Sequence, residues 1–87
     1  MTVSIAGRVD TTTAPKLESE LMEDISGITA LTLDFSGVEY ISSAGLRVLL
    51  VMQKLMNKQG KMVINNVNDE IMEIFEVTGF VDILTIE

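Results

Sequence analysis

The chain has 87 residues, enough for one small domain with one hydrophobic core, and its 13 acidic and 6 basic side chains give a formal net charge of −7. It contains no cysteine and no histidine, so disulfide bonds and thiolate nucleophiles are excluded, and the usual general base and transition-metal ligand is missing. Such an acidic chain repels nucleic-acid phosphates and anionic lipid, and no segment approaches the roughly 18 consecutive apolar residues of a membrane span. We therefore expect a cytoplasmic protein without metal or cofactor, whose partners are proteins.

The amino-terminal third of the chain predicts a strand followed by an amphipathic helix. Val3 and Ile5 alternate with small or polar residues, which is typical of a strand that ends near Gly7–Asp10. Pro15 is tolerated in the first turn of a helix, where its missing N–H is not needed, and Thr13 is the expected cap. The apolar face of this helix repeats at a spacing of four residues before a serine-glycine pair ends it: Leu17, Leu21 and Ile25.

The middle of the chain predicts a second strand and the longest helix. Alternating apolar and polar residues over 31–35 indicate a strand, and Ser36-Gly37 indicates a turn behind it. From Ser43 to about Lys58 there is no proline, and the apolar side chains fall on one broad arc of a helical wheel. We therefore expect this helix to cover most of the sheet.

The last third of the chain predicts a strand, a helix and a final strand. Residues 62–64 form a short apolar run typical of a buried strand. Asn68 is a suitable helix cap, acidic residues follow it in the first turn, and Gly79 marks the end of this helix. Residues 81–86 can form the last strand.

Strict alternation of strands and helices, in the order βαβαβαβ, predicts a single α/β domain with a mostly parallel sheet. The carboxyl ends of parallel strands meet at one edge of a sheet, where functional loops gather. We therefore expect residues 10–13, 36–43 and 65–68 to share one rim.

One long stretch carries a family resemblance. Residues 33–50, LDFSGVEYISSAGLRVLL, resemble the signature of the STAS domain, in particular that of the bacterial anti-sigma-factor antagonists. Supporting matches are Gly7-Arg8-Val9-Asp10, the Thr-Ala-Pro helix start and the FEVTGF run over 75–80. The resemblance covers nearly the whole chain, so we expect one STAS-like domain over residues 1–87.

The resemblance implies a phosphorylation-controlled switch. The unphosphorylated form would bind a partner that is both anti-sigma factor and serine kinase and so free a sigma factor, and a serine phosphatase would reset the phosphorylated form. Alignment on Gly45-Leu46 places the family's phosphoacceptor on Ser43. The chain departs from the family at Ser42, where relatives often have Asp, and at Ala44, where many have Ser or Thr. Ser42 is therefore the fallback acceptor.

The ends of the chain also depart from the family pattern. Many relatives carry another strand before the Gly-Arg-Val-Asp element and another helix after the final strand. We therefore expect an uncovered edge strand or apolar sheet face, and self-association stays open.

Ser43 also has a purely structural interpretation, because a serine at the start of a helix can cap it. A phosphoryl group there would add about −1.5 to −2 charges at a helix N-terminus, which favours an anion. We therefore expect phosphorylation to disrupt a partner interface and not the fold.

Basic residues gather on the predicted long helix, since residues 40–68 hold four bases and no acid. Leu46 and Leu50 lie beside these bases on the helical wheel, where they either pack under a neighbouring element or form the apolar centre of a partner site. Asp10, at a strand end, is either a turn residue bonded to the following amides or part of this surface. We expect Tyr40 and Phe80 to be packing residues. The predicted partner-binding residues are Asp10, Ser42, Ala44, Leu46, Arg47, Leu50, Lys54 and Asn57.

Other functions fit the sequence less well. A serine after a strand resembles the nucleophile elbow of hydrolases, but Ile41 occupies its first glycine position and no histidine can accept the proton, so we predict no catalytic residues. No phosphate-binding loop is present, so a nucleotide should bind the kinase partner instead. The main alternative is a STAS interaction subunit of a lipid-transport complex or a signalling scaffold, which would use the same surface without phosphorylation.

Overall fold

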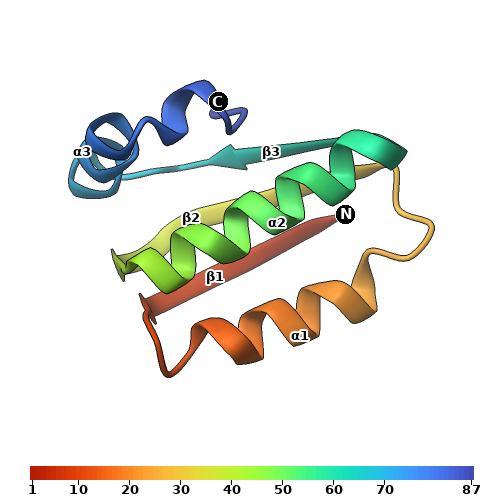
Figure 1. Cartoon of the computed structure of the whole chain (residues 1–87), viewed down its shortest axis with the longest axis horizontal. Coiled ribbons are helices and arrows are strands. Elements are labelled where there is room, and N and C mark those ends of the chain that lie inside the picture. Colours follow the sequence, from red (N-terminus) through yellow and green to blue (C-terminus); the bar gives the residue numbers. More distant parts are fainter.

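The computed structural model describes all 87 residues and shows a parallel sheet of three strands in the order β1-β2-β3 (Figure 1). This arrangement confirms the predicted α/β fold with a mostly parallel sheet. No helix combines the length and the hydropathy that a membrane span requires. The elements in chain order are β1 (Thr2–Val9), α1 (Ala14–Asp24), β2 (Ala30–Ile41), α2 (Ser43–Gln59), β3 (Lys61–Asn65), α3 (Asp69–Thr78) and the 3-10 helix η1 (Phe80–Asp82).

The helix α2 lies across the sheet, and α1 and α3 lie on its two sides (Figure 1). Its buried apolar side chains join those of all three strands in one cluster of 20 buried residues. Next to α3, the ring centroids of Phe35 on β2 and Phe75 on α3 are 6.2 Å apart. This aromatic contact packs α3 against β2. On the other face of β1, Ser4, Ala6 and Arg8 are exposed, so that face stays open. As expected from the sequence, β1 is an edge strand.

The predicted turn at Ser36-Gly37 is wrong, because β2 continues through it to Ile41. The pairing of β1 with β2 is irregular at two places, between Ser4 and Ala6 and between Gly7 and Arg8, and β2 carries one extra residue at each. A bulge of this kind accommodates Ser36 and Gly37, which a regular strand disfavours. Gly37 is needed there because a Cβ on it would lie 2.9 Å from the Cβ of Ala6.

The length of β2 has a consequence for the predicted rim. Strand β3 pairs with β2 only as far as Asp34, whereas β1 pairs with it to the end, Val9 opposite Ile41. The loop after β3 therefore lies along the middle of β2, where the side-chain amide of Asn68 donates to the carbonyl of Val38 at 3.0 Å. Only the loops after β1 and β2 share a rim.

The predicted strand over 81–86 is reduced to one parallel bridge between Ile64 and Ile86. Gly79, with a φ of 80°, ends α3 as predicted and turns the chain back into η1. The amides of Ile83 and Leu84 then both donate to the carbonyl of Phe80, which keeps this segment coiled. Residues 83–87 therefore make one bridge to β3 in place of a full fourth strand.

Gly45 lets the first turn of α2 pack directly on the ends of β1 and β2. A Cβ at this position would lie 2.7 Å from Ile41 Cγ1, 2.8 Å from Val9 Cγ1 and 3.0 Å from the carbonyl oxygen of Val9. Two of these atoms belong to buried β-branched side chains, which cannot move away easily. The site described below depends on this close approach.

We predict that Gly45→Ala lowers the free energy of unfolding by about 1 to 3 kcal/mol, because the overpacked methyl group outweighs the better helix propensity of alanine. Urea unfolding followed by circular dichroism measures this change. The control is Ser43→Ala in the same turn, where the side chain is exposed and little change is expected. An unchanged or higher unfolding midpoint for Gly45→Ala would contradict the packing described here.

Candidate functional site

The two neighbouring serines have different roles at the start of α2. Ser42 has extended backbone, and its Oγ accepts the N–H of Gly45 at 3.4 Å, so Ser42 is the cap of the helix. The prediction that Ser43 caps this helix is therefore wrong by one residue. Ser43 is the first helical residue, its side chain is exposed, and no hydrogen bond holds its hydroxyl. The structure thus leaves one serine hydroxyl free at the helix start and engages the other.

A backbone hydrogen bond ties this helix start to β1. The N–H of Ser42 donates to the carbonyl of Val9 at 2.8 Å, and the N–H of Leu46 donates to the carbonyl of Ser42 at 2.9 Å. Asp10 comes directly after Val9, and Ser43 comes directly after Ser42. Because the Ser42 N–H is bonded to the Val9 carbonyl, these two predicted site residues lie at the same corner of the sheet. Their proximity confirms that the loops after β1 and β2 share a rim.

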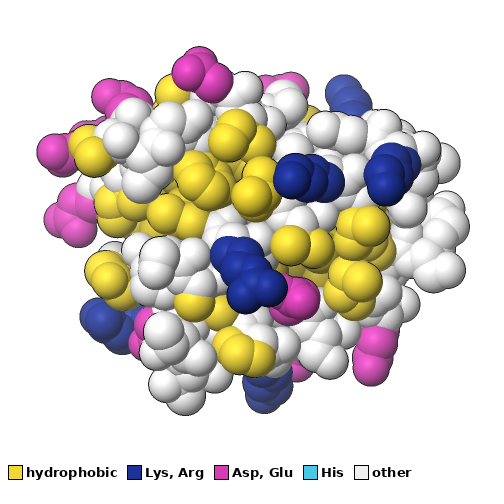
Figure 2. Space-filling model, viewed as in Figure 1, with side chains coloured by type: hydrophobic (Ala, Val, Ile, Leu, Met, Phe, Trp, Pro, Cys, Tyr) yellow, Lys and Arg dark blue, Asp and Glu magenta, His cyan; other side chains and the backbone are white.

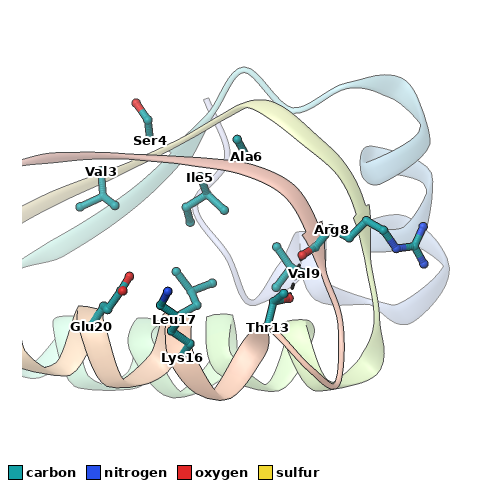
Figure 3. Close-up of a pocket in the computed structure, with 10 residues that line it drawn as sticks. All are labelled: Val3, Ser4, Ile5, Ala6, Arg8, Val9, Thr13, Lys16, Leu17 and Glu20. Carbon is teal, nitrogen blue, oxygen red and sulfur yellow. Dashed lines mark hydrogen bonds between the residues drawn. The ribbon is translucent and has the colours of Figure 1, made fainter.

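The carboxylate of Asp10 organises the loop after β1. Its Oδ1 accepts the N–H groups of Thr12 at 2.9 Å and Thr13 at 3.1 Å, which confirms the turn interpretation. These two bonds, that of Thr13 first, hold the pKa of the Asp10 carboxyl below its ordinary value of 3.8. The Thr13 hydroxyl donates to the carbonyl of Arg8 at 2.7 Å (Figure 3) and does not cap α1, contrary to prediction.

A second lowered pKa belongs to Asp34, in the middle of β2. Its Oδ1 accepts the N–H of Ser36 at 2.9 Å and the side-chain amide of Asn66 at 3.0 Å, and these bonds lower the pKa of the carboxyl. Asn66 has a φ of 57°, a conformation that asparagine tolerates better than most residues. Asp34 therefore fastens the loop after β3 to β2 and lies away from Ser43.

The outward face of α2 is only partly as predicted. Leu46 is buried in the core cluster, so its assignment to the centre of a partner site is wrong, and the packing alternative holds. Leu50 is half-buried and lies outside this cluster. Ala44 is also half-buried but packs against the core. Exposed polar or basic side chains flank Leu50 along the helix: Arg47, Lys54, Asn57 and Lys58.

Figure 2 shows Lys and Arg side chains along α2, with hydrophobic surface on both sides of them and most acidic side chains near the margin. A groove of about 310 Å³ runs between α1 and α2, and Ala44, Arg47 and Glu18 are among the residues that line it. A second groove, of about 280 Å³, lies between β1 and α1 and has no residue of α2 in its lining (Figure 3). No group of three carboxylates lies close enough to hold a metal ion.

Two features of this region escaped the sequence analysis. Gln53, on α2, is only 3% exposed, and its amide nitrogen donates to Asn57 Oδ1 at 2.9 Å while its Oε1 has no partner. Tyr40 is 39% exposed, so its prediction as a packing residue is wrong, whereas Phe80 does pack against the core. Plain alternation from Leu33 and Phe35 along β2 already places Tyr40 on the outward face, so the sequence did carry this signal.

The STAS domain model matches residues 1–87, the whole chain. The chain belongs to the STAS domain family. It is 38% identical over 84 residues to BtrV of Bordetella bronchiseptica, a candidate anti-sigma factor antagonist, covering 94% of this chain and 72% of BtrV. It is 33% identical over 88 residues to the anti-sigma-B factor antagonist of Listeria monocytogenes, covering 98% of this chain and 76% of that relative. A crystal structure of an anti-sigma factor antagonist from Mycobacterium paratuberculosis superposes with a TM-score of 0.87 at 26% identity, over 98% of this chain and 74% of that one.

We predict that the lowered pKa values of Asp10 and Asp34 make the stability of the fold sensitive to acid. A carboxylate whose pKa is lower in the folded than in the unfolded chain stabilises the fold above the unfolded value, and that stability is lost as the pH falls through the folded value. The urea concentration at the midpoint of unfolding should therefore fall below about pH 4. This fall should be less steep for Asp10→Asn, which lacks one of the two carboxylates. Carboxyl titration by NMR gives the direct check, and a midpoint of 3.8 or higher for Asp10 would contradict the hydrogen bonding described above.

Proposed function

We propose that this protein is an anti-sigma-factor antagonist that works as a phosphorylation-controlled switch. In its unphosphorylated form it binds an anti-sigma factor that is also a serine kinase, and a sigma factor is freed. The kinase then transfers a phosphoryl group to the Ser43 hydroxyl, and a serine phosphatase removes it. The protein binds and is modified but catalyses nothing itself, and this role places it in the cytoplasm.

One observation carries the proposal beyond family membership: the Ser43 hydroxyl is free at an exposed helix start. A kinase must bring the hydroxyl to the γ-phosphate of its nucleotide, so an acceptor has to protrude and be unengaged. Ser42 fits this requirement less well, since its side chain is half-buried and caps α2. Ser43 is therefore the proposed phosphoacceptor, with Ser42 as the fallback.

Phosphorylation at Ser43 should change binding and leave the fold intact. The added dianion would lie at the first turn of α2, where the helix dipole and free N–H groups favour negative charge. It would not displace the cap, which belongs to Ser42. A partner surface matched to a hydroxyl would, however, have to desolvate a dianion, which weakens the complex.

The proposed binding surface surrounds Ser43 on the outward side of α2. Half-buried Leu50 supplies an apolar contact, and exposed Arg47, Lys54 and Asn57 supply a polar rim, as interfaces commonly have. Asp10, Ser42 and Ala44 lie where the rim meets the loop after β1. Because the surface is basic on an acidic protein, it favours a partner that is acidic at this place.

Mass spectrometry of the protein recovered from its own cells tests the switch. Trypsin releases residues 17–47 as one peptide that holds both serines. We expect one added phosphoryl group on Ser43, resolved from Ser42 by fragmentation. Phosphate on Ser42 alone would overturn the site assignment. A peptide that stays unmodified through growth and stress would overturn the switch and favour a STAS subunit of a transport complex or scaffold.

We predict that Leu50→Asp weakens binding of the anti-sigma factor by tenfold or more, because it places a charge at the apolar centre of the surface. Isothermal titration calorimetry with the purified anti-sigma factor measures the affinity. Val77→Asp is a matched control, since Val77 is an exposed apolar residue on α3. Equal loss in both variants, or none in Leu50→Asp with its fold intact, would contradict the proposed surface.

A further inference from the structure

Arg8 and Tyr40 form an exposed pair on the open face of the sheet. They are register partners on β1 and β2, and the guanidinium carbon of Arg8 lies 4.5 Å from the centre of the Tyr40 ring. The Arg8 side chain is 61% exposed, and its guanidinium points away from the groove between β1 and α1 (Figure 3). The arrangement is a cation–π contact at the surface of the protein.

Asp10 holds the same arginine from another side. Its Oδ2 lies 3.6 Å from Arg8 Nε, and this is the one ion pair in the structure. The carboxylate is itself fixed through Oδ1 by the N–H groups of Thr12 and Thr13. Arg8 is therefore oriented by a ring and a fixed carboxylate, while its two terminal nitrogens donate to no protein acceptor.

Core packing gives no reason for this arrangement. Neither Arg8 nor Tyr40 belongs to the core cluster or packs against it, and solvent-exposed ion pairs add little stability. Tyrosine and arginine are, in contrast, the residues that most often dominate the binding energy of protein interfaces. Holding such side chains in place before binding reduces the entropy lost on association.

The pair also lies at the corner that carries Ser43. Arg8 precedes Val9, whose carbonyl accepts the N–H of Ser42, and Tyr40 lies two residues before Ser42. The pair and the outward face of α2 are on opposite faces of the sheet at the same end. A partner that covers Ser43 and extends around this end of the sheet would meet both.

We propose that Arg8 and Tyr40 form a second contact of the anti-sigma-factor interface, in which the Arg8 guanidinium receives a carboxylate of the partner and the Tyr40 ring gives apolar contact. The geometry argues for this occupant, because the exposed Arg8 guanidinium is held by Asp10 only through Nε and keeps its two terminal nitrogens for a carboxylate. Asp10 is then a positioning residue that orients Arg8. The proposal rests on the proposed function and extends its surface to the open face of the sheet.

Calorimetry with the purified serine-kinase anti-sigma factor of the same organism tests the pair. Arg8→Gln and Tyr40→Ala should each weaken binding by about tenfold, and Arg8→Gln should reduce the salt dependence of the affinity. The double variant should lose less than the product of the two single effects, because the two side chains support each other. Asp10→Asn should weaken binding in the presence of Arg8 and have little further effect in Arg8→Gln.

Met22→Ala is the matched control, because Met22 is an exposed apolar residue on α1, away from this corner, and it should bind as the unaltered protein does. If Tyr40→Ala does not fold, the same contact is tested with Tyr40→Lys, which replaces the ring by a charge, and with Arg8→Gln, which removes the guanidinium. Both variants should weaken binding. Unchanged affinity of the pair's variants, with Leu50→Asp weakened, would overturn this inference and leave the proposed function standing. Failure of the unaltered protein to bind the anti-sigma factor would overturn both.

Discussion

The hydrogen bond from the Ser42 N–H to the Val9 carbonyl, together with the close approach of Gly45 to the same strand end, is the constraint on which the site depends. It joins the end of β1, the end of β2 and the start of α2 at one point. Because α2 begins there and is buried along its length against the sheet, its first turn cannot shift without disturbing the core. Ser43 is thereby presented at a fixed position with its hydroxyl free.

The same constraint explains how a small charge change could control binding without changing the fold. The capping oxygen belongs to Ser42, the core contacts belong to Gly45 and Leu46, and Ser43 contributes to neither. Under the proposed function, modification of Ser43 would therefore act on the surface alone. Basic and half-buried apolar side chains surround Ser43 on one face of the sheet, and the Arg8–Tyr40 pair lies on the other face. A partner that binds at this corner can therefore contact both faces.

The sequence predicted the alternation of elements, the α/β class and the family, because hydrophobic periodicity and caps such as Asn68 and Gly79 are local signals. Its errors came from contacts that are remote in sequence. The extension of β2 to Ile41 depends on its pairing with β1, and it leaves the loop after β3 beside the middle of β2. Leu46 looked superficial on a helical wheel but packs into the core, and the helix cap shifted to Ser42 because β2 runs on to Ile41.

The most direct test of the account uses protein carrying phosphoserine only at position 43, introduced during synthesis and compared with the unmodified chain. The account predicts that its affinity for the anti-sigma factor falls by about a hundredfold or more, with an unchanged unfolding midpoint and amide NMR shifts confined to the start of α2 and the loop after β1. Equal affinity of the two forms would contradict the switch. Loss of the folded state on phosphorylation would contradict the claim that α2 tolerates the charge.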